Sequence, residues 1–224
     1  INKNSFILFL YLTVPSFLSM RKDLIKQFKE KGFVTVPNVF TLSEMEFYRE
    51  VIKDAIKERK QHDLRSLDDK SEYEQSFIQC QNLWEDYPAI RELTFDQRLG
   101  EIASNLLGVN KLRVWHDQAL VKEAGGRETD PHHDQPYWPI KETNTITAWI
   151  PFCDVSEKNG QLGFYPGSHQ IKENQFINIF SGKVDDSELK DIPQIKDSEV
   201  EYQNLNIGDV SFHHGLTFHR AKPN

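Results

Sequence analysis

The spacing of apolar residues changes near Leu112. Before that position apolar residues recur every three or four residues, which predicts amphipathic helices over 21–31, 43–60, 87–94 and 97–107. The segment FVTVPNVF predicts a strand over 33–37. Thr41 and Glu44 match a capping box at the start of the second helix, and Gly108 stands where the last helix would end.

After Leu112 the apolar residues fall in short β-branched and aromatic segments separated by Gly, Pro, Asn and Asp, a pattern typical of strands. These segments are LRVWHDQALVK, TITAWIPFCDV, GQLGFYP and GDVSFHHGLTFH. A series of short antiparallel strands suits a sandwich or jelly roll. We therefore predict a mainly β protein with flanking helices (α+β), in which N-terminal helices pack outside a double-stranded β-helix of the cupin-like type. Residues 62–86 and 170–200 are polar and are predicted to be loops, the second one with few apolar anchors.

The size and charge of the chain restrict the class of protein. A length of 224 residues fits one catalytic domain. The net charge is -7 and no basic stripe recurs, which argues against nucleic acid as a partner. Cys80 and Cys153 lie far apart and form no CxxC motif, so we predict free thiols in a reducing compartment, the cytoplasm.

The N-terminal residues differ from the rest of the chain. Residues 6–14, FILFLYLTV, are apolar but are followed by Pro15 and are too few to span a bilayer as a helix, so no stable membrane insertion is predicted. The run resembles the apolar part of a secretory signal, although only Lys3 precedes it and the cleavage pattern is poor. We interpret residues 1–19 as upstream or leader sequence, with a signal peptide as the alternative, and 20–224 as a single domain.

The segment DPHHDQPYW contains candidate metal ligands. Side chains two residues apart on an extended strand point the same way, so His132 and Asp134 can face inward while His133 points out. Two imidazoles and one carboxylate on one face of a metal are the ligands of non-haem Fe(II) oxygenases. A second imidazole could come from His213, His214 or His219, and strand alternation does not choose among them.

Five segments together resemble the phytanoyl-CoA dioxygenase family, which comprises Fe(II)- and 2-oxoglutarate-dependent oxygenases. They are GFVTVPNVF, HHDQPYW, TAWIPFCDV, NGQLGFYPGSH and GDVSFHHGLTFHRAKPN, and the likeness extends from about residue 24 to the end. In that family the distal histidine ligand precedes an asparagine by five residues, as His219 precedes Asn224. The resemblance therefore implies that His132, Asp134 and His219 bind iron.

The resemblance also implies contacts to the co-substrate. Trp149 matches a tryptophan that lines the 2-oxoglutarate pocket, and Gln118 matches a position that contacts the co-substrate, although simple packing is an alternative for both. The family arginine that binds the distal carboxylate is expected beyond Asn224, so we expect the chain to be truncated at its C-terminus. Other cations that could take this role are Arg113, Lys122 and Arg220.

The implied activity is hydroxylation of a small-molecule substrate by molecular oxygen, with release of succinate and carbon dioxide. Halogenating relatives have a small residue in the place of Asp134, so the carboxylate favours hydroxylation. Two alternatives stay open at this point: a non-oxidative metal-dependent enzyme on a cupin-like barrel, and a binding or scaffold protein with a degenerate site.

Overall fold

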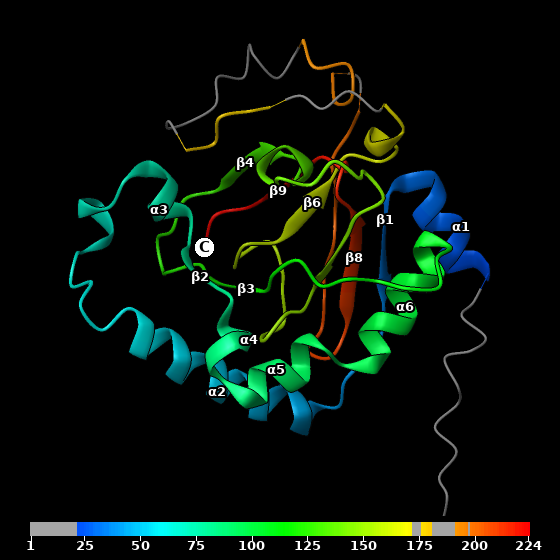
Figure 1. The fold of residues 1–224 in the computed structure, drawn as a ribbon. Helices are drawn as coiled ribbons and strands as arrows, with labels where there is room; N and C mark the ends of the chain where they lie inside the picture. Colours follow the sequence, from blue (N-terminus) through cyan, green and yellow to red (C-terminus); the bar gives the residue numbers. More distant parts are fainter. Residues whose placement is uncertain (1–21, 172–175, 181–190, 197) are drawn as a thin grey trace, which may run out of the picture.

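The computed structural model describes residues 22–171, 176–180, 191–196 and 198–224 (Figure 1). Within them every paired strand is antiparallel. The three-stranded sheet has the order β1 (Phe33–Val36), β8 (Val210–His214), β5 (Ile146–Trp149). The four-stranded sheet has the order β4 (Thr129–His132), β9 (His219–Ala221), β6 (Leu162–Phe164), β7 (Glu201–Tyr202), and a separate pair joins β2 (Ile78–Gln81) to β3 (Gln118–Val121).

The helices lie around the strands in Figure 1. They are α1 (Lys22–Lys31), α2 (Leu42–Arg59), α3 (Glu72–Ser76), α4 (Leu83–Asp86), α5 (Pro88–Thr94) and α6 (Gln97–Leu107), with single 3₁₀ turns at Leu67–Asp69, Gln135–Tyr137 and Ser168–Gln170. The main core cluster joins Val210 and Phe212 of β8 to apolar residues of α1, α2, α5 and α6. Since strand residues alternate, Ser211 and His213 face the other side of the sheet, away from the helices.

The predicted fold is confirmed. The helices expected at 21–31, 43–60, 87–94 and 97–107 form within a residue of these bounds in the described part of the chain. The capping box forms as well: the Glu44 amide donates to the Thr41 hydroxyl at 3.3 Å, and the Thr41 amide donates to the Glu44 carboxylate at 2.8 Å. Gly108 ends α6 in the left-handed conformation, with φ 68°.

Three local predictions were wrong. The strand expected from Leu112 begins only at Gln118, and the polar region 62–86 contains β2, which pairs with β3. The region 170–200 was expected to have few apolar anchors, but its described part contains buried isoleucines, which pack with Tyr165 and Phe218. These are Ile177, Ile179, Ile192 and Ile195. These isoleucines fall in two short stretches, 176–180 and 191–196, which are too short to show a periodicity, so the pattern did not reveal this second cluster.

No helix among the described residues is long and apolar enough to cross a membrane. The apolar run at 6–14 lies outside these residues. Both cysteines are free thiols, as predicted; Cys80 is buried and Cys153 exposed.

Candidate metal centre

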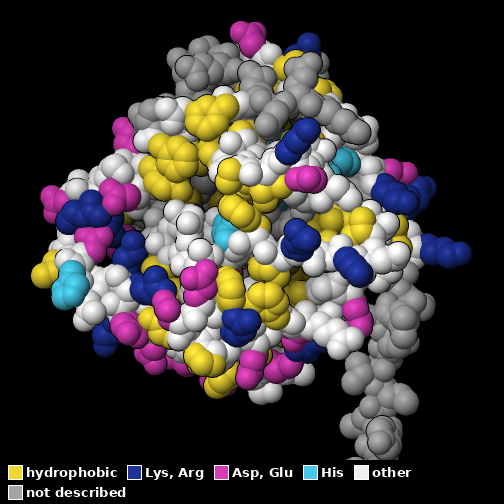
Figure 2. All heavy atoms as spheres, viewed as in Figure 1, with side chains coloured by type: hydrophobic (Ala, Val, Ile, Leu, Met, Phe, Trp, Pro, Cys, Tyr) yellow, Lys and Arg dark blue, Asp and Glu magenta, His cyan; other side chains and the backbone are white. Residues whose placement is uncertain are grey.

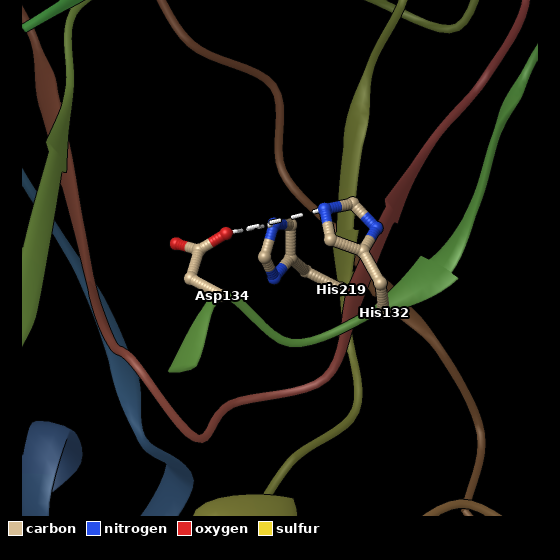
Figure 3. A group of neighbouring side chains, drawn as sticks. All are labelled: His132, Asp134 and His219. Atoms are coloured by element: carbon tan, nitrogen blue, oxygen red, sulfur yellow. Dashed lines mark ion pairs between the residues drawn. The ribbon is translucent and has the colours of Figure 1, made fainter. Parts of the chain in front are cut away.

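Three side chains predicted to bind iron converge between the two larger sheets (Figure 3). One ligand atom from each of His132, Asp134 and His219 lies within 4.8 Å of the other two. The Nε2 atoms of His132 and His219 are 4.0 and 3.8 Å from Asp134 Oδ1. Metal–ligand bonds of about 2.0–2.2 Å require the three ligating atoms to lie within roughly 5 Å of one another, and these atoms do.

The pairing of β4 with β9 brings the two histidines together. His132 at the end of β4 stands opposite His219 at the start of β9, and their ring centroids are 4.3 Å apart. Asp134 reaches them differently from the prediction, which placed it on the same extended strand as His132. β4 ends at His132, and Asp134 adopts helical dihedrals, φ −71° and ψ −33°, at the start of the 3₁₀ turn Gln135–Tyr137. This turn, rather than strand alternation, directs the carboxylate inward.

The backbone selects the tautomer of both histidines. His132 Nδ1 lies 2.7 Å from the Asp130 carbonyl, and His219 Nδ1 lies 3.0 Å from the Thr217 carbonyl. A carbonyl only accepts, so each Nδ1 carries the proton and each Nε2 keeps its lone pair. Burial lowers the pKa of both imidazoles, that of His219 well below its usual value, so both are neutral at pH 7, as metal ligation requires.

The Asp134 carboxylate is oriented by two side chains from the opposite sheet. The Thr147 hydroxyl of β5 donates to Oδ2 at 2.9 Å, and His213 Nε2 of β8 lies 3.3 Å from the same oxygen. Thr147 and His213 are themselves cross-strand partners. Oδ1 is thereby left for a metal. Burial opposes ionisation, but His219, His213 and His132 together hold the Asp134 pKa well below its usual range.

The remaining candidate histidines have other places. His214 faces the helices, where its ring lies 6.4 Å from that of Phe28, and His214 Nδ1 accepts the Leu216 amide at 3.1 Å. His133, predicted to point away from His132 and Asp134, is not in the ligand group; its ring packs 4.6 Å from that of Phe218, and it is 1% exposed. The reason is that the second apolar cluster covers this side of the sheet. Thr147 was not predicted at all, since an alternating strand gives no sign of which threonine meets a carboxylate.

The two predicted co-substrate residues lie in different surroundings. Trp149 packs against a buried cluster that includes Phe164, whose ring centroid is 6.0 Å from that of His219. Gln118 on β3 is exposed and accepts the Gln79 side-chain amide at 2.9 Å. Trp149 thus packs against a cluster that also contacts a metal ligand, whereas Gln118 is tied to the neighbouring strand.

The cations considered for the distal carboxylate are mostly engaged. Arg220 forms an ion pair with Glu128, and it follows His219 directly, so it points to the opposite face of β9. Lys122 is not solvated: its amine donates to the carbonyls of Ser76 and Arg127 at 2.9 and 2.6 Å. Burial lowers the pKa of Lys122 to about 8. Arg113 is exposed.

The donor set fits a divalent transition metal. Two neutral imidazole nitrogens and one carboxylate oxygen are the ligands of the non-haem Fe(II) facial triad. Two ligand atoms at right angles on a metal, with bonds of about 2.1 Å, lie roughly 3 Å apart. The ligating atoms of the three side chains would each have to shift by less than about 1 Å to reach this separation. The triad leaves other metal positions open to small molecules.

A family comparison agrees with this chemistry. The model of the phytanoyl-CoA dioxygenase family matches residues 28–224. The chain belongs to the phytanoyl-CoA dioxygenase family. Its similarity to curated and solved members shows the class to be that of non-haem iron, 2-oxoglutarate-dependent dioxygenases.

The proteins that this chain resembles differ in their reactions. A probable alpha-ketoglutarate-dependent hypophosphite dioxygenase of Stutzerimonas stutzeri is 23% identical over 89% of this chain and 72% of its own. A non-heme alpha ketoglutarate dependent carbocyclase from nogalamycin biosynthesis is 27% identical with a TM-score of 0.76, over 91% of this chain and 78% of that one. An epimerase of the same biosynthesis, solved with Fe3+, alpha ketoglutarate and nogalamycin RO, is 23% identical with a TM-score of 0.70, over 91% and 77%, and supports the fold. The chain spans about half the length of two other curated relatives that it matches.

Proposed function

We propose that this protein is an Fe(II)- and 2-oxoglutarate-dependent dioxygenase that hydroxylates a small-molecule substrate. The observation that carries the proposal is the convergence of His132 Nε2, His219 Nε2 and Asp134 Oδ1. The other polar atom of each side chain, Nδ1 of the histidines and Oδ2 of the aspartate, is already hydrogen-bonded within the protein. We assign these three residues as the iron ligands. Residues 20–224 are proposed to form a single catalytic domain, in the cytoplasm.

The carboxylate ligand favours hydroxylation. His132, Asp134 and His219 would hold the iron, and the Asp134 carboxylate would take the position that a halide needs, so the site would favour hydroxylation over halogenation. When bound, iron and 2-oxoglutarate supply the oxidation itself, with release of succinate and carbon dioxide.

The protein contributes ligand orientation and a dry environment. The Asp130 and Thr217 carbonyls fix the two imidazoles, while Thr147 and His213 fix the carboxylate. His219 is buried and His132 and Asp134 are only partly exposed, which limits access of water to a metal held there. Trp149 is proposed as a wall of the co-substrate pocket because it packs against the cluster that contains Phe164, whose ring lies beside that of His219. Gln118 is proposed as a co-substrate contact on the family resemblance alone.

The proposal is tested in two steps. Anaerobic addition of Fe(II) and 2-oxoglutarate should produce the visible absorption of an iron–oxoacid chelate, and His132→Ala should abolish it, whereas replacement of the exposed His62 by alanine should not. Oxygen should then yield succinate, and mass spectrometry of the organic product should show one added oxygen atom.

Each alternative gives a different result. A product with two hydrogens fewer than the substrate and no added oxygen would indicate ring closure or desaturation instead of hydroxylation, within the same class of oxygenases. Metal binding without succinate would indicate a non-oxidative metalloenzyme. Absence of both would leave a binding or scaffold protein.

A further inference from the structure

Five aromatic rings lie in contact beside the metal centre, and we call them the aromatic wall. They are Tyr73, Phe77, Tyr137, Phe176 and Phe180, whose neighbouring ring centroids are 4.6 to 5.6 Å apart. Figure 2 shows hydrophobic side chains gathered on this face, between α3 and β4. Rings at these separations attract further rings by offset stacking or edge-to-face contact.

Tyr137 connects the wall to the metal ligands. It ends the 3₁₀ turn that begins after Asp134, and its ring centroid lies 6.1 Å from that of His132. The Tyr137 hydroxyl donates to the Ile177 carbonyl at 2.6 Å, which ties the turn to residues 176–180. The wall is therefore continuous with the metal centre.

The segment 176–180 presents its rings outward. Ile177 and Ile179 are each 7% exposed and anchor the segment in the second apolar cluster, while Phe176 and Phe180 are 56% and 52% exposed. Phe176 and Phe180 flank the two buried isoleucines, one at each end of the segment, and both rings are left exposed. Exposed apolar rings gathered beside a catalytic centre mark a binding surface for a small molecule.

Two arginines of the described residues near the wall are already paired with carboxylates. Arg65 of the described chain is paired with Asp63 and Glu74, at 2.8 and 2.7 Å. Arg127 is paired with Asp130 at 3.1 Å. Among the described residues, a substrate bound at the wall meets rings and these two paired arginines.

We propose that the aromatic wall binds an uncharged, ring-bearing apolar portion of the substrate and so holds a C–H bond of that molecule beside the metal. This assignment rests on the proposed function. It deepens it by naming the substrate class: an apolar ring compound rather than a small inorganic oxyanion or a polyphosphate ester.

The test uses N-phenyl-1-naphthylamine, a neutral aromatic probe that fluoresces on leaving water. It is titrated into the anaerobic protein loaded with Fe(II) and 2-oxoglutarate. The double variant Phe176→Ser/Phe180→Ser should weaken probe binding roughly tenfold to a hundredfold, since each ring contact corresponds to a factor of about three to ten. Phe47→Ser is the matched control, because Phe47 on α2 is 53% exposed and outside the wall, and it should leave the affinity unchanged.

A second measurement places the probe relative to the metal. With Mn(II) in place of Fe(II), the proton resonances of the bound probe should broaden, and His132→Ala should remove the broadening without removing the binding. Equal affinity in the wild type and the double variant, or binding without broadening, would overturn the assignment of the wall.

The two proposals fail separately. Loss of the iron–oxoacid absorption in the wild type would count against the dioxygenase, whatever the probe does. A normal absorption in the double variant shows that its metal centre is intact, so a lost probe affinity there reports on the wall itself. A normal absorption with unchanged probe affinity would refute the wall alone.

Discussion

Thr147→Val is expected to weaken metal binding without disturbing the fold. Valine keeps the shape and the strand propensity of threonine but removes the hydroxyl that donates to Asp134 Oδ2 at 2.9 Å. A hydrogen bond to a charged group contributes about 1.5–3 kcal/mol, and His213 still contacts the same oxygen, so the lower end applies. At tenfold per about 1.4 kcal/mol, Fe(II) affinity should fall roughly tenfold, in the range found for partners of metal ligands.

The affinity is measured by anaerobic competition between the protein and a coloured Fe(II) chelator. Thr35→Val is the matched control: Thr35 lies on β1 of the same sheet, and its hydroxyl only approaches Gln203 at 3.5 Å. Thermal unfolding of the metal-free variants should show little difference between the two. Wild-type affinity in Thr147→Val would refute the reasoning, because it would mean that the metal alone orients Asp134.

Three further predictions concern residues around the site. Ile192→Ala should lower the free energy of unfolding, measured in urea, by about 2–5 kcal/mol, because Ile192 is 2% exposed. Ile171→Ala, at a residue that is 36% exposed, should lower it by less than about 0.5 kcal/mol, and equal effects would contradict the burial of Ile192 in the second apolar cluster. Gly215→Ala should destabilise the protein by about 1–3 kcal/mol, because the added Cβ would lie 2.1 Å from Thr145 Oγ1. Gly100→Ala, whose Cβ would meet nothing within 4 Å, should stabilise it slightly, and an unchanged stability of the Gly215 variant would show that the backbone at this position shifts easily. The thermal stability of the wild type should rise relative to that of Lys122→Met as the pH increases from 8 toward 10. Burial lowers the pKa of Lys122 in the folded protein to about 8, so in this pH range the unfolded chain binds more protons than the folded one. Parallel pH profiles of the two proteins would argue against a buried amine.

The sequence predicted the principal helices and the nature of the metal site, because both depend on local patterns. The capping box at Thr41 and the left-handed Gly108 are decided by neighbouring residues, so they could be read directly. The H-x-D motif named His132 and Asp134, although by the wrong geometry, since a 3₁₀ turn and not a continuous strand directs the carboxylate.

The rest depends on contacts between residues far apart in the chain. Which of three histidines joins the site follows from the register of β4 with β9, and the role of Thr147 follows from that of β5 with β8. No local periodicity encodes either register. The same holds for Tyr137, whose place beside His132 depends on an anchor about forty residues later, at Ile177.

The length of the connection between β8 and β9 decides which side chain of β9 reaches the metal site. Residues 215–218 carry the chain from the three-stranded sheet to the four-stranded sheet, so His213 supports the carboxylate from one side and His219 supplies an imidazole from the other. Since successive strand residues face opposite ways, removing one residue from this connection would exchange the faces of β9. Arg220 would then occupy the place of His219, and a permanently charged guanidinium would replace a metal-binding nitrogen. The number of residues in one short turn thus separates a metal-binding pocket from a cationic one.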